Sequence, residues 1–162
     1  MRLTRRGVMA GLSLAAFAGQ ARAQVKPLVL YDDGLQNDWQ NWSWATVQLA
    51  APAGSVKPIK VEGGPWSALL LHHAPISTAG FSKLTFYVNG GVDGGQTVMV
   101  KASVAGKLVE KPFVIQPKVK AWAVVEVPLR EIGADNQTVD GFAWQAQAEG
   151  VKPYYVTKVQ LE

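Results

Sequence analysis

Aromatic residues on the polar sides of predicted strands are the side chains in this sequence best suited to bind a ligand. Trp42 and Trp44 lie two residues apart, and Tyr87 and Trp122 occupy polar positions of two further strands. Residues two apart on a strand share one face and lie about 7 Å from each other. Indole and phenol rings combine a large apolar area with a polar edge, which suits stacking on the C–H-rich faces of sugars. The pattern therefore predicts a glycan-binding platform.

Further residues are predicted to complete this platform. Trp39 and Trp66 are expected at its rim, and His72 is expected as a ligand contact. His73 points to the opposite face because neighbours in a strand alternate, and the sequence has no third histidine, so a histidine metal site is not expected. Polar residues that would bond sugar hydroxyls are Gln48, Asn89 and Lys101. The alternative is that a loop covers the tryptophans, which then form a second small core.

Signatures of catalysis are scarce in the sequence. It has no nucleophile motif and no glycine-rich phosphate loop before a helix. Zero cysteines exclude disulfides, thiol chemistry and cysteine zinc sites. Apart from Asp32-Asp33 the acids are scattered singly; this pair precedes Gly34 and fits either a turn or a calcium site. We therefore predict a binding protein and no enzyme. The less favoured alternative is a small glycan-active hydrolase, which would need two carboxylates within about 5–10 Å of each other.

Period-2 alternation dominates the chain after residue 24 and predicts an all-β antiparallel sandwich in one domain, residues 24–162. The alternation places Leu84, Phe86 and Val88 inward, and Met99, Lys101 and Ser103 outward. Ala105-Gly106 is typical of a tight hairpin, and one helical turn is expected over 129–132. The predicted strands are 27–31, 42–50, 58–62, 66–72, 83–89, 97–104, 107–115, 121–127, 141–147 and 153–161.

Residues 1–23 have the three parts of a cleaved export signal. Arg5-Arg6 stands before an uncharged run of mostly small and apolar residues, and Ala21-Arg22-Ala23 offers small residues at a cleavage site. The run is shorter than the roughly 20 apolar residues of a membrane-spanning helix. The paired arginines resemble a twin-arginine signal, with the Sec route as the alternative. We therefore expect an exported protein, periplasmic or extracellular, with no membrane span in its mature part.

The charge of the chain resides in this signal. The whole sequence holds 16 Lys+Arg against 12 Asp+Glu, and residues 1–23 contribute four arginines and no acid. The remainder therefore has equal numbers of basic and acidic residues. Because binding of nucleic acid or of anionic membranes needs a basic surface, neither partner is expected.

Three stretches resemble the carbohydrate-binding-module-like jelly rolls of the galactose-binding-like superfamily. They are 29–44 with Tyr31-Asp32-Asp33-Gly34 and Trp42-Ser43-Trp44, 65–88 with Pro65-Trp66-Ser67, and the closing segment 139–161. The resemblance implies a noncatalytic sugar-binding sandwich, with protein binding in the cell envelope as the alternative. It also implies a structural calcium at Asp32 or Asp33, although the last strand carries Thr157 where an Asp is common.

Overall fold

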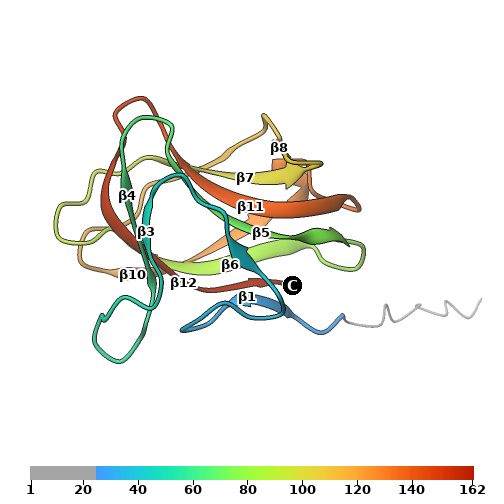
Figure 1. Cartoon of the computed structure of the whole chain (residues 1–162), viewed down its shortest axis with the longest axis horizontal. Helices are drawn as coiled ribbons and strands as arrows, with labels where there is room; N and C mark the ends of the chain where they lie inside the picture. Colours follow the sequence, from blue (N-terminus) through green and yellow to red (C-terminus); the bar gives the residue numbers. More distant parts are fainter. Residues whose placement is uncertain (1–24) are drawn as a thin grey trace, which may run out of the picture.

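The computed structural model describes residues 25–162, which form two antiparallel β-sheets packed face to face (Figure 1). The predicted all-β sandwich is confirmed. The predicted signal, residues 1–23, lies outside the described residues. No helix within residues 25–162 is long and apolar enough to span a membrane.

Sheet A has the hydrogen-bonded order β10-β6-β12-β4-β3, and β1 pairs with β12 in addition. Its strands are β1 Leu28–Tyr31, β3 Thr46–Gln48, β4 Ile59–Gly63, β6 Lys83–Asn89, β10 Trp122–Pro128 and β12 Val151–Leu161. The predicted helical turn is a 3-10 turn, Leu129–Ile132, directly after β10.

Sheet B has the order β2-β5-β11-β7-β8, and β9 also pairs with β7. Its strands are β2 Gln40–Asn41, β5 Ala68–Ser77, β7 Val98–Val104, β8 Lys107–Leu108, β9 Phe113–Ile115 and β11 Thr138–Ala146. From β4 onward the long strands alternate between the sheets, so the sheets share one core (Figure 1).

The core lies between the sheets and consists of the inward side chains that alternation predicts. Leu84 and Phe86 are fully buried on β6, as are Phe142 and Trp144 on β11. Phe86 and Trp144 meet edge to face across the sandwich, with ring centroids 5.2 Å apart. Because inward residues alternate with outward ones, each sheet also has an outer face on which side chains are displayed.

Two predicted strands are interrupted in the structure. Of the predicted strand 42–50, only residues 46–48 form a strand, β3. The predicted strand 107–115 is divided into β8 and β9, with an irregular segment between them. The hairpin between β7 and β8 is confirmed, with Ala105 at φ 49° and Gly106 at φ 74°. Positive φ at both central residues gives the backbone twist that two-residue hairpins require.

Candidate functional site

Three strands of sheet B, β5, β11 and β7, together with the segment after β2, align a row of side chains on the surface that faces away from the core. Ala143 of β11 pairs with Leu70 of β5 on one side and with Lys101 of β7 on the other. Trp42, just after β2, donates its backbone N–H to Leu70 O at 2.9 Å and extends the row. Because the neighbouring Trp144 points into the core, alternation directs this row outward. We call this surface the sheet B face.

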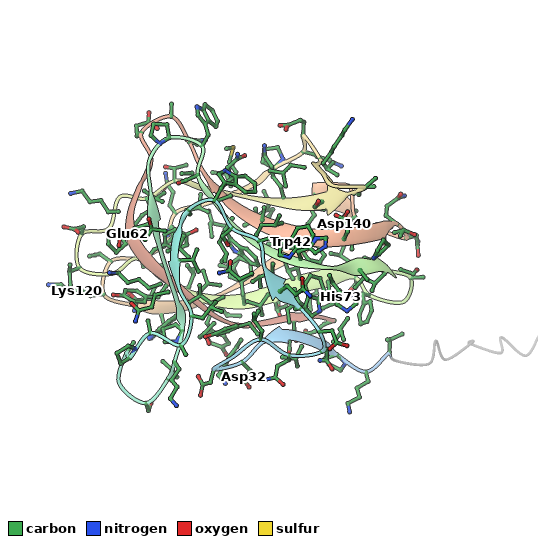
Figure 2. All side chains as sticks on the ribbon, viewed as in Figure 1. Asp32, Trp42, Glu62, His73, Lys120 and Asp140 are labelled. Atoms are coloured by element: carbon green, nitrogen blue, oxygen red, sulfur yellow. The ribbon has the colours of Figure 1, made fainter. Side chains whose placement is uncertain are left out.

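Trp42 is fixed on the sheet B face by contacts to one ring face and one ring edge. Its indole stacks on the His72 imidazole, with centroids 3.5 Å apart and 18° between the planes. Its Nε1–H donates to Gln40 Oε1 at 2.9 Å. Trp42 is nevertheless 56% exposed. Figure 2 labels its position on the ribbon. The indole is thus held in place while much of its surface stays open to a ligand.

The backbone that carries the two tryptophans is held against the edge of β5. Asn41 Oδ1 accepts hydrogen bonds from the Ser43 backbone N–H and hydroxyl. Ser43 Oγ in turn accepts the Leu70 N–H at 2.9 Å, and the Trp44 N–H donates to Ala68 O at 3.0 Å. An Asn side chain that bonds its own backbone two residues on stabilises such a turn. This turn ends β2 and presents Trp42 and Trp44 at the edge of the sheet.

Trp44 and Trp66 lie together at the end of the sheet B face. Trp44 Nε1–H donates to Trp66 O at 2.9 Å, and Gln145 Nε2–H donates to the same carbonyl at 3.0 Å. The loop before β5 turns sharply, with Trp66 at φ 61°. Trp44 is 50% and Trp66 is 54% exposed. The hydrogen bonds join the loop, the edge segment and β11, so both exposed rings are carried by an ordered frame.

Polar groups occupy the opposite side of the sheet B face. Lys101 Nζ is 2.9 Å from Glu110 Oε2, and the Lys101 side chain is buried although it points outward. Its strand, β7, is an interior strand of sheet B, because β8 and β9 also pair with it. Near this side, Asp140 Oδ2 accepts the Gly106 N–H at 2.7 Å, whereas the buried Asp140 Oδ1 has no hydrogen-bond partner within residues 25–162.

The candidate residues predicted from the sequence do not include three polar residues of this surface: Gln40, Gln145 and Glu110. Alternation over 141–147 would have placed Gln145 outward, opposite in direction to Trp144. Glu110 lies in the irregular segment between β8 and β9, where no alternation places it. Gln40 belongs to the two-residue β2, and its position depends on pairing with β5, which is distant in sequence. The sequence has no signal for that pairing.

Trp39 requires a correction. It was expected at the rim of the platform, but it is 3% exposed and belongs to the core cluster. Its indole packs on Phe142, with centroids 6.1 Å apart, and tilts against His73 at 5.1 Å. Trp39 directly precedes β2, the two-residue edge strand of sheet B, and its indole lies on the core side of this strand. Trp39 is therefore a packing residue.

Tyr87 and Trp122 also require a correction, since they do not share a face with Trp42 and Trp44. Tyr87 lies on β6 and Trp122 on β10, two paired strands of sheet A. Both rings are exposed, at 42% and 38%. They face away from the core on the other side of the sandwich. Neighbours in a strand alternate in direction, and Phe86 and Val88, on either side of Tyr87, point into the core. The predicted platform is thus two separate aromatic surfaces.

The side chains of Asp32 and Asp33 do not fit a calcium site. Asp32 Oδ1 lies 3.2 Å from Lys158 Nζ, and Asp33 Oδ1 accepts the Lys57 backbone N–H at 2.8 Å. Calcium needs six to eight oxygen ligands. Within residues 25–162 no group of three or more histidine, aspartate or glutamate side chains is close enough to hold a metal ion. An ammonium group instead neutralises Asp32.

Two carboxylates converge on sheet A. Glu126 Oε1 and Glu162 Oε2 lie 2.8 and 3.3 Å from the shared Lys83 Nζ. The hydrogen bond from Gln160, and then the contact with Lys83, hold the pKa of Glu162 below its ordinary value. A general acid for glycoside hydrolysis needs a raised pKa. Glu162 therefore does not have the raised pKa of such an acid.

Solved structures with the same architecture include carbohydrate-binding modules. A variant of the family 29 module CBM29-2 superimposes with a TM-score of 0.62 at 15% identity, covering 85% of this chain and 92% of that one. The family 11 module of the cellulase Lic26A-Cel5E of Clostridium thermocellum gives a TM-score of 0.61 at 14% identity, covering 86% and 95%. A third, described as a family 29 module, gives 0.60 at 13% identity, covering 84% and 87%.

At these identities the similarity concerns the fold, and the resemblance to a carbohydrate-binding-module-like jelly roll is confirmed at that level. No protein-family model matches the sequence. No curated protein matches it either.

Proposed function

We propose that the protein binds a glycan chain through the sheet B face, without hydrolysing it. Trp42 and Trp44 stack on sugar rings, Trp66 contacts the chain at the rim, and Gln145 bonds hydroxyls. The observation that carries this proposal is the fixed, half-open indole of Trp42, stacked on His72 and bonded to Gln40. A rigid aromatic contributes binding area at low conformational cost.

The structural neighbours support a glycan as the ligand. They are carbohydrate-binding modules, and one variant of the family 29 module is described as complexed with cellulohexaose; it superimposes with a TM-score of 0.61 at 14% identity. That ligand belongs to the neighbour. It makes β-1,4-linked hexasaccharides a rational first panel of probes for this chain.

Binding of cellohexaose, mannohexaose and xylohexaose, measured by isothermal titration calorimetry, tests the proposal. We expect Trp42→Ala and Trp44→Ala each to weaken binding of the preferred hexasaccharide about tenfold or more, or about 1.4 kcal/mol. The exposure of both indoles means that the substitutions leave the core intact. Val92→Ala serves as control, because Val92 is 76% exposed on a loop away from the sheet B face.

Two results would contradict the proposal. Unchanged affinity in the Trp42 and Trp44 variants would remove these rings from the site. Failure of a broad glycan array to bind the wild-type protein would remove the glycan itself, and retention of a purified envelope protein would then favour protein recognition. Release of reducing ends from a bound hexasaccharide would overturn the noncatalytic part.

We propose further that the protein is exported by the twin-arginine route and that its mature chain begins at Gln24. Arg5-Arg6 and the Ala21-Arg22-Ala23 cleavage site support this assignment. A receptor reads the paired arginines, so the combined substitution Arg5→Lys and Arg6→Lys should abolish the processed form in a bacterial periplasmic fraction. Arg2→Lys should leave it unchanged.

The amino terminus of the exported form, determined by mass spectrometry, is the direct measurement. Processed protein from the double-lysine variant at the wild-type level would exclude the twin-arginine route and favour Sec. An exported chain that still begins at Met1 would exclude cleavage.

A further inference from the structure

A hollow of about 330 Å³ lies on the outer face of sheet A, on the side of the sandwich away from the sheet B face. Its volume is at the lower end of the range of about 300–1,000 Å³ found for ligand pockets. Residues from β1, β6, β10 and β12 line it. They include Thr85, Tyr87, Val124, Glu126, Gln160 and Glu162.

Irregular pairing at one strand explains why the sheet is hollowed here. The register of β12 against β6 shifts between Thr157 and Gln160, and Lys158 has φ 51°. The pairing of β1 with β12 shifts as well, between Val29 and Tyr31. An extra residue in a strand bends it and raises its twist. Both irregularities lie at the hollow, whose lining includes Val29 and Lys158.

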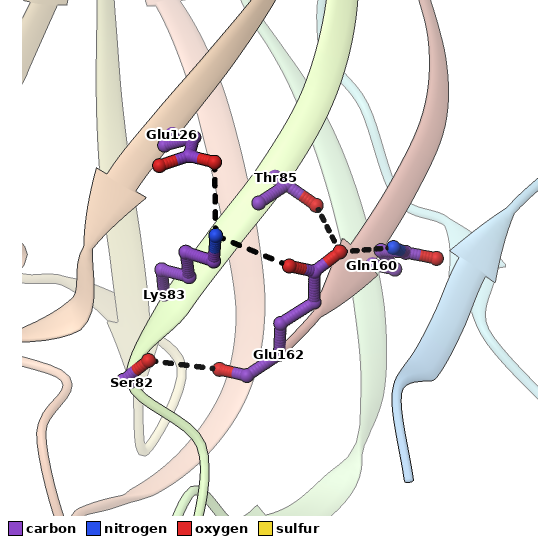
Figure 3. Close-up of polar contacts among 6 residues, drawn as sticks. All are labelled: Ser82, Lys83, Thr85, Glu126, Gln160 and Glu162. Atoms are coloured by element: carbon purple, nitrogen blue, oxygen red, sulfur yellow. Dashed lines mark hydrogen bonds and ion pairs between the residues drawn. The ribbon is translucent and has the colours of Figure 1, made fainter.

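The polar groups of the hollow are held in place before any ligand arrives. Lys83 joins Glu126 and Glu162, and Glu162 Oε1 accepts hydrogen bonds from Thr85 Oγ1 and Gln160 Nε2 (Figure 3). Carboxylates have about four acceptor positions each, so both can bond further hydroxyl donors. A set of fixed acceptors and donors on adjacent strands is suited to a ligand with several hydroxyl groups.

An apolar strip borders these groups on one side. Tyr87 is 42% and Val124 is 57% exposed, and both line the hollow. Trp122, 38% exposed, lies two residues before Val124 on the same face. Aromatic faces beside fixed hydrogen-bonding groups are the combination that binds a sugar ring. The exposed rings on this sheet thus have polar neighbours of the kind that a sugar requires.

The charge around the hollow restricts the kind of sugar. Asp32, Glu126 and Glu162 supply three carboxylates, and Lys83 and Lys158 supply two ammonium groups. Each ammonium is already paired with a carboxylate. An anionic sugar would add a like charge to a site with an excess of carboxylates, so a neutral sugar is favoured over an anionic one.

We propose that this hollow is a second glycan site, specific for a neutral sugar unit, and that one chain bridges two glycan strands from its opposite faces. The bridging rests on the function proposed for the sheet B face, whereas the sheet A site itself does not. Tyr87 stacks on the sugar ring, and Glu126, Gln160 and Glu162 bond its hydroxyls.

Titration of the ¹⁵N-labelled protein with cellohexaose, mannohexaose and xylohexaose, followed by amide shifts, separates the two faces. In the variant Trp42→Ala/Trp44→Ala we expect shifts on β6, β10 and β12 to persist while those on β5 and β11 disappear. Adding Tyr87→Ala should weaken the remaining binding about tenfold. Tyr87→Phe keeps the ring and should retain it, and Val92→Ala should keep both sets of shifts.

The outcomes distinguish the two proposals. Loss of all shifts in the double tryptophan variant, or a wild-type response confined to β5 and β11, overturns the sheet A site and leaves the sheet B site standing. A response on β6, β10 and β12 alone supports the sheet A site and overturns the sheet B site, and bridging with it. Silence toward these probes and toward a broad glycan array overturns both sites. Stronger binding of hexagalacturonate on sheet A overturns the neutral-sugar specificity.

Bridging has its own readout. The protein, confirmed as a monomer by light scattering, should raise the turbidity of a soluble polysaccharide built from the preferred sugar. Trp42→Ala/Trp44→Ala and Tyr87→Ala should each bind the polysaccharide without raising turbidity. Turbidity that persists in either variant would contradict two-faced bridging.

Discussion

Lys83 shows how one side chain organises a surface of this protein. It stands between Glu126 and Glu162, and the hydrogen bonds to these two carboxylates, Glu126 first, raise the pKa of its ammonium group. Gln160 and Lys83 together lower the pKa of Glu162. All the groups concerned are partly exposed, so water screens their attraction. The network therefore orients side chains more than it stabilises the fold.

The lowered pKa of Glu162 predicts an acid-side dependence of stability. A carboxylate whose pKa is lower in the folded state stabilises the fold above its unfolded pKa, and this contribution is lost as pH falls through the folded pKa. Glu162→Gln should therefore lower Tm slightly at about pH 7 and by less at about pH 3. Thermal unfolding followed by circular dichroism measures the difference. A Tm difference that is constant or grows toward low pH would contradict the assignment.

The strands with regular alternation could be predicted from the sequence, and the interrupted ones could not. In β6, and in β11 from Phe142 onward, every second residue is apolar, and the structure places these residues in the core. The predicted strand 42–50 alternates equally well but is divided, because its first residues pair with β5 and β3 pairs with β4 in the other sheet. Alternation reports which side of a strand is buried. It carries no information on which sheet a segment joins.

The same limit explains the predicted platform. Alternation identified Trp42, Trp44, Tyr87 and Trp122 as outward-facing residues, and all four are exposed. It could not assign them to sheets, so two surfaces were predicted as one. Trp39 failed for a different reason, because it precedes a strand of only two residues and has no alternation to place it.

At the scale of the whole molecule, the two outer faces depend on a core that joins the sheets without disulfides. Trp144 from sheet B lies against Phe86 from sheet A, and both are fully buried. Both proposed sites stand on the strands that carry these residues, β11 and β6. Loss of the contact between the sheets would therefore disturb both faces together.

Trp144→Ala should destabilise the protein by about 3–5 kcal/mol, the range found for truncation of large buried aromatics. This is a large part of the roughly 5–15 kcal/mol of a typical domain. Trp144→Phe should cost less, because it leaves a smaller cavity and removes the buried Trp144 Nε1–H, which has no hydrogen-bond partner within residues 25–162. Urea unfolding measures both variants.

Trp122→Ala is the matched control, since it removes the same side chain from an exposed position on β10. It should change stability by about 1 kcal/mol or less, because substitutions at exposed positions have small effects. Equal losses in the Trp144 and Trp122 variants would contradict the assignment of one indole to the core and the other to a surface. Loss of sugar binding on both faces in a still-folded Trp144→Phe variant would show that the shared core sets the geometry of both sites.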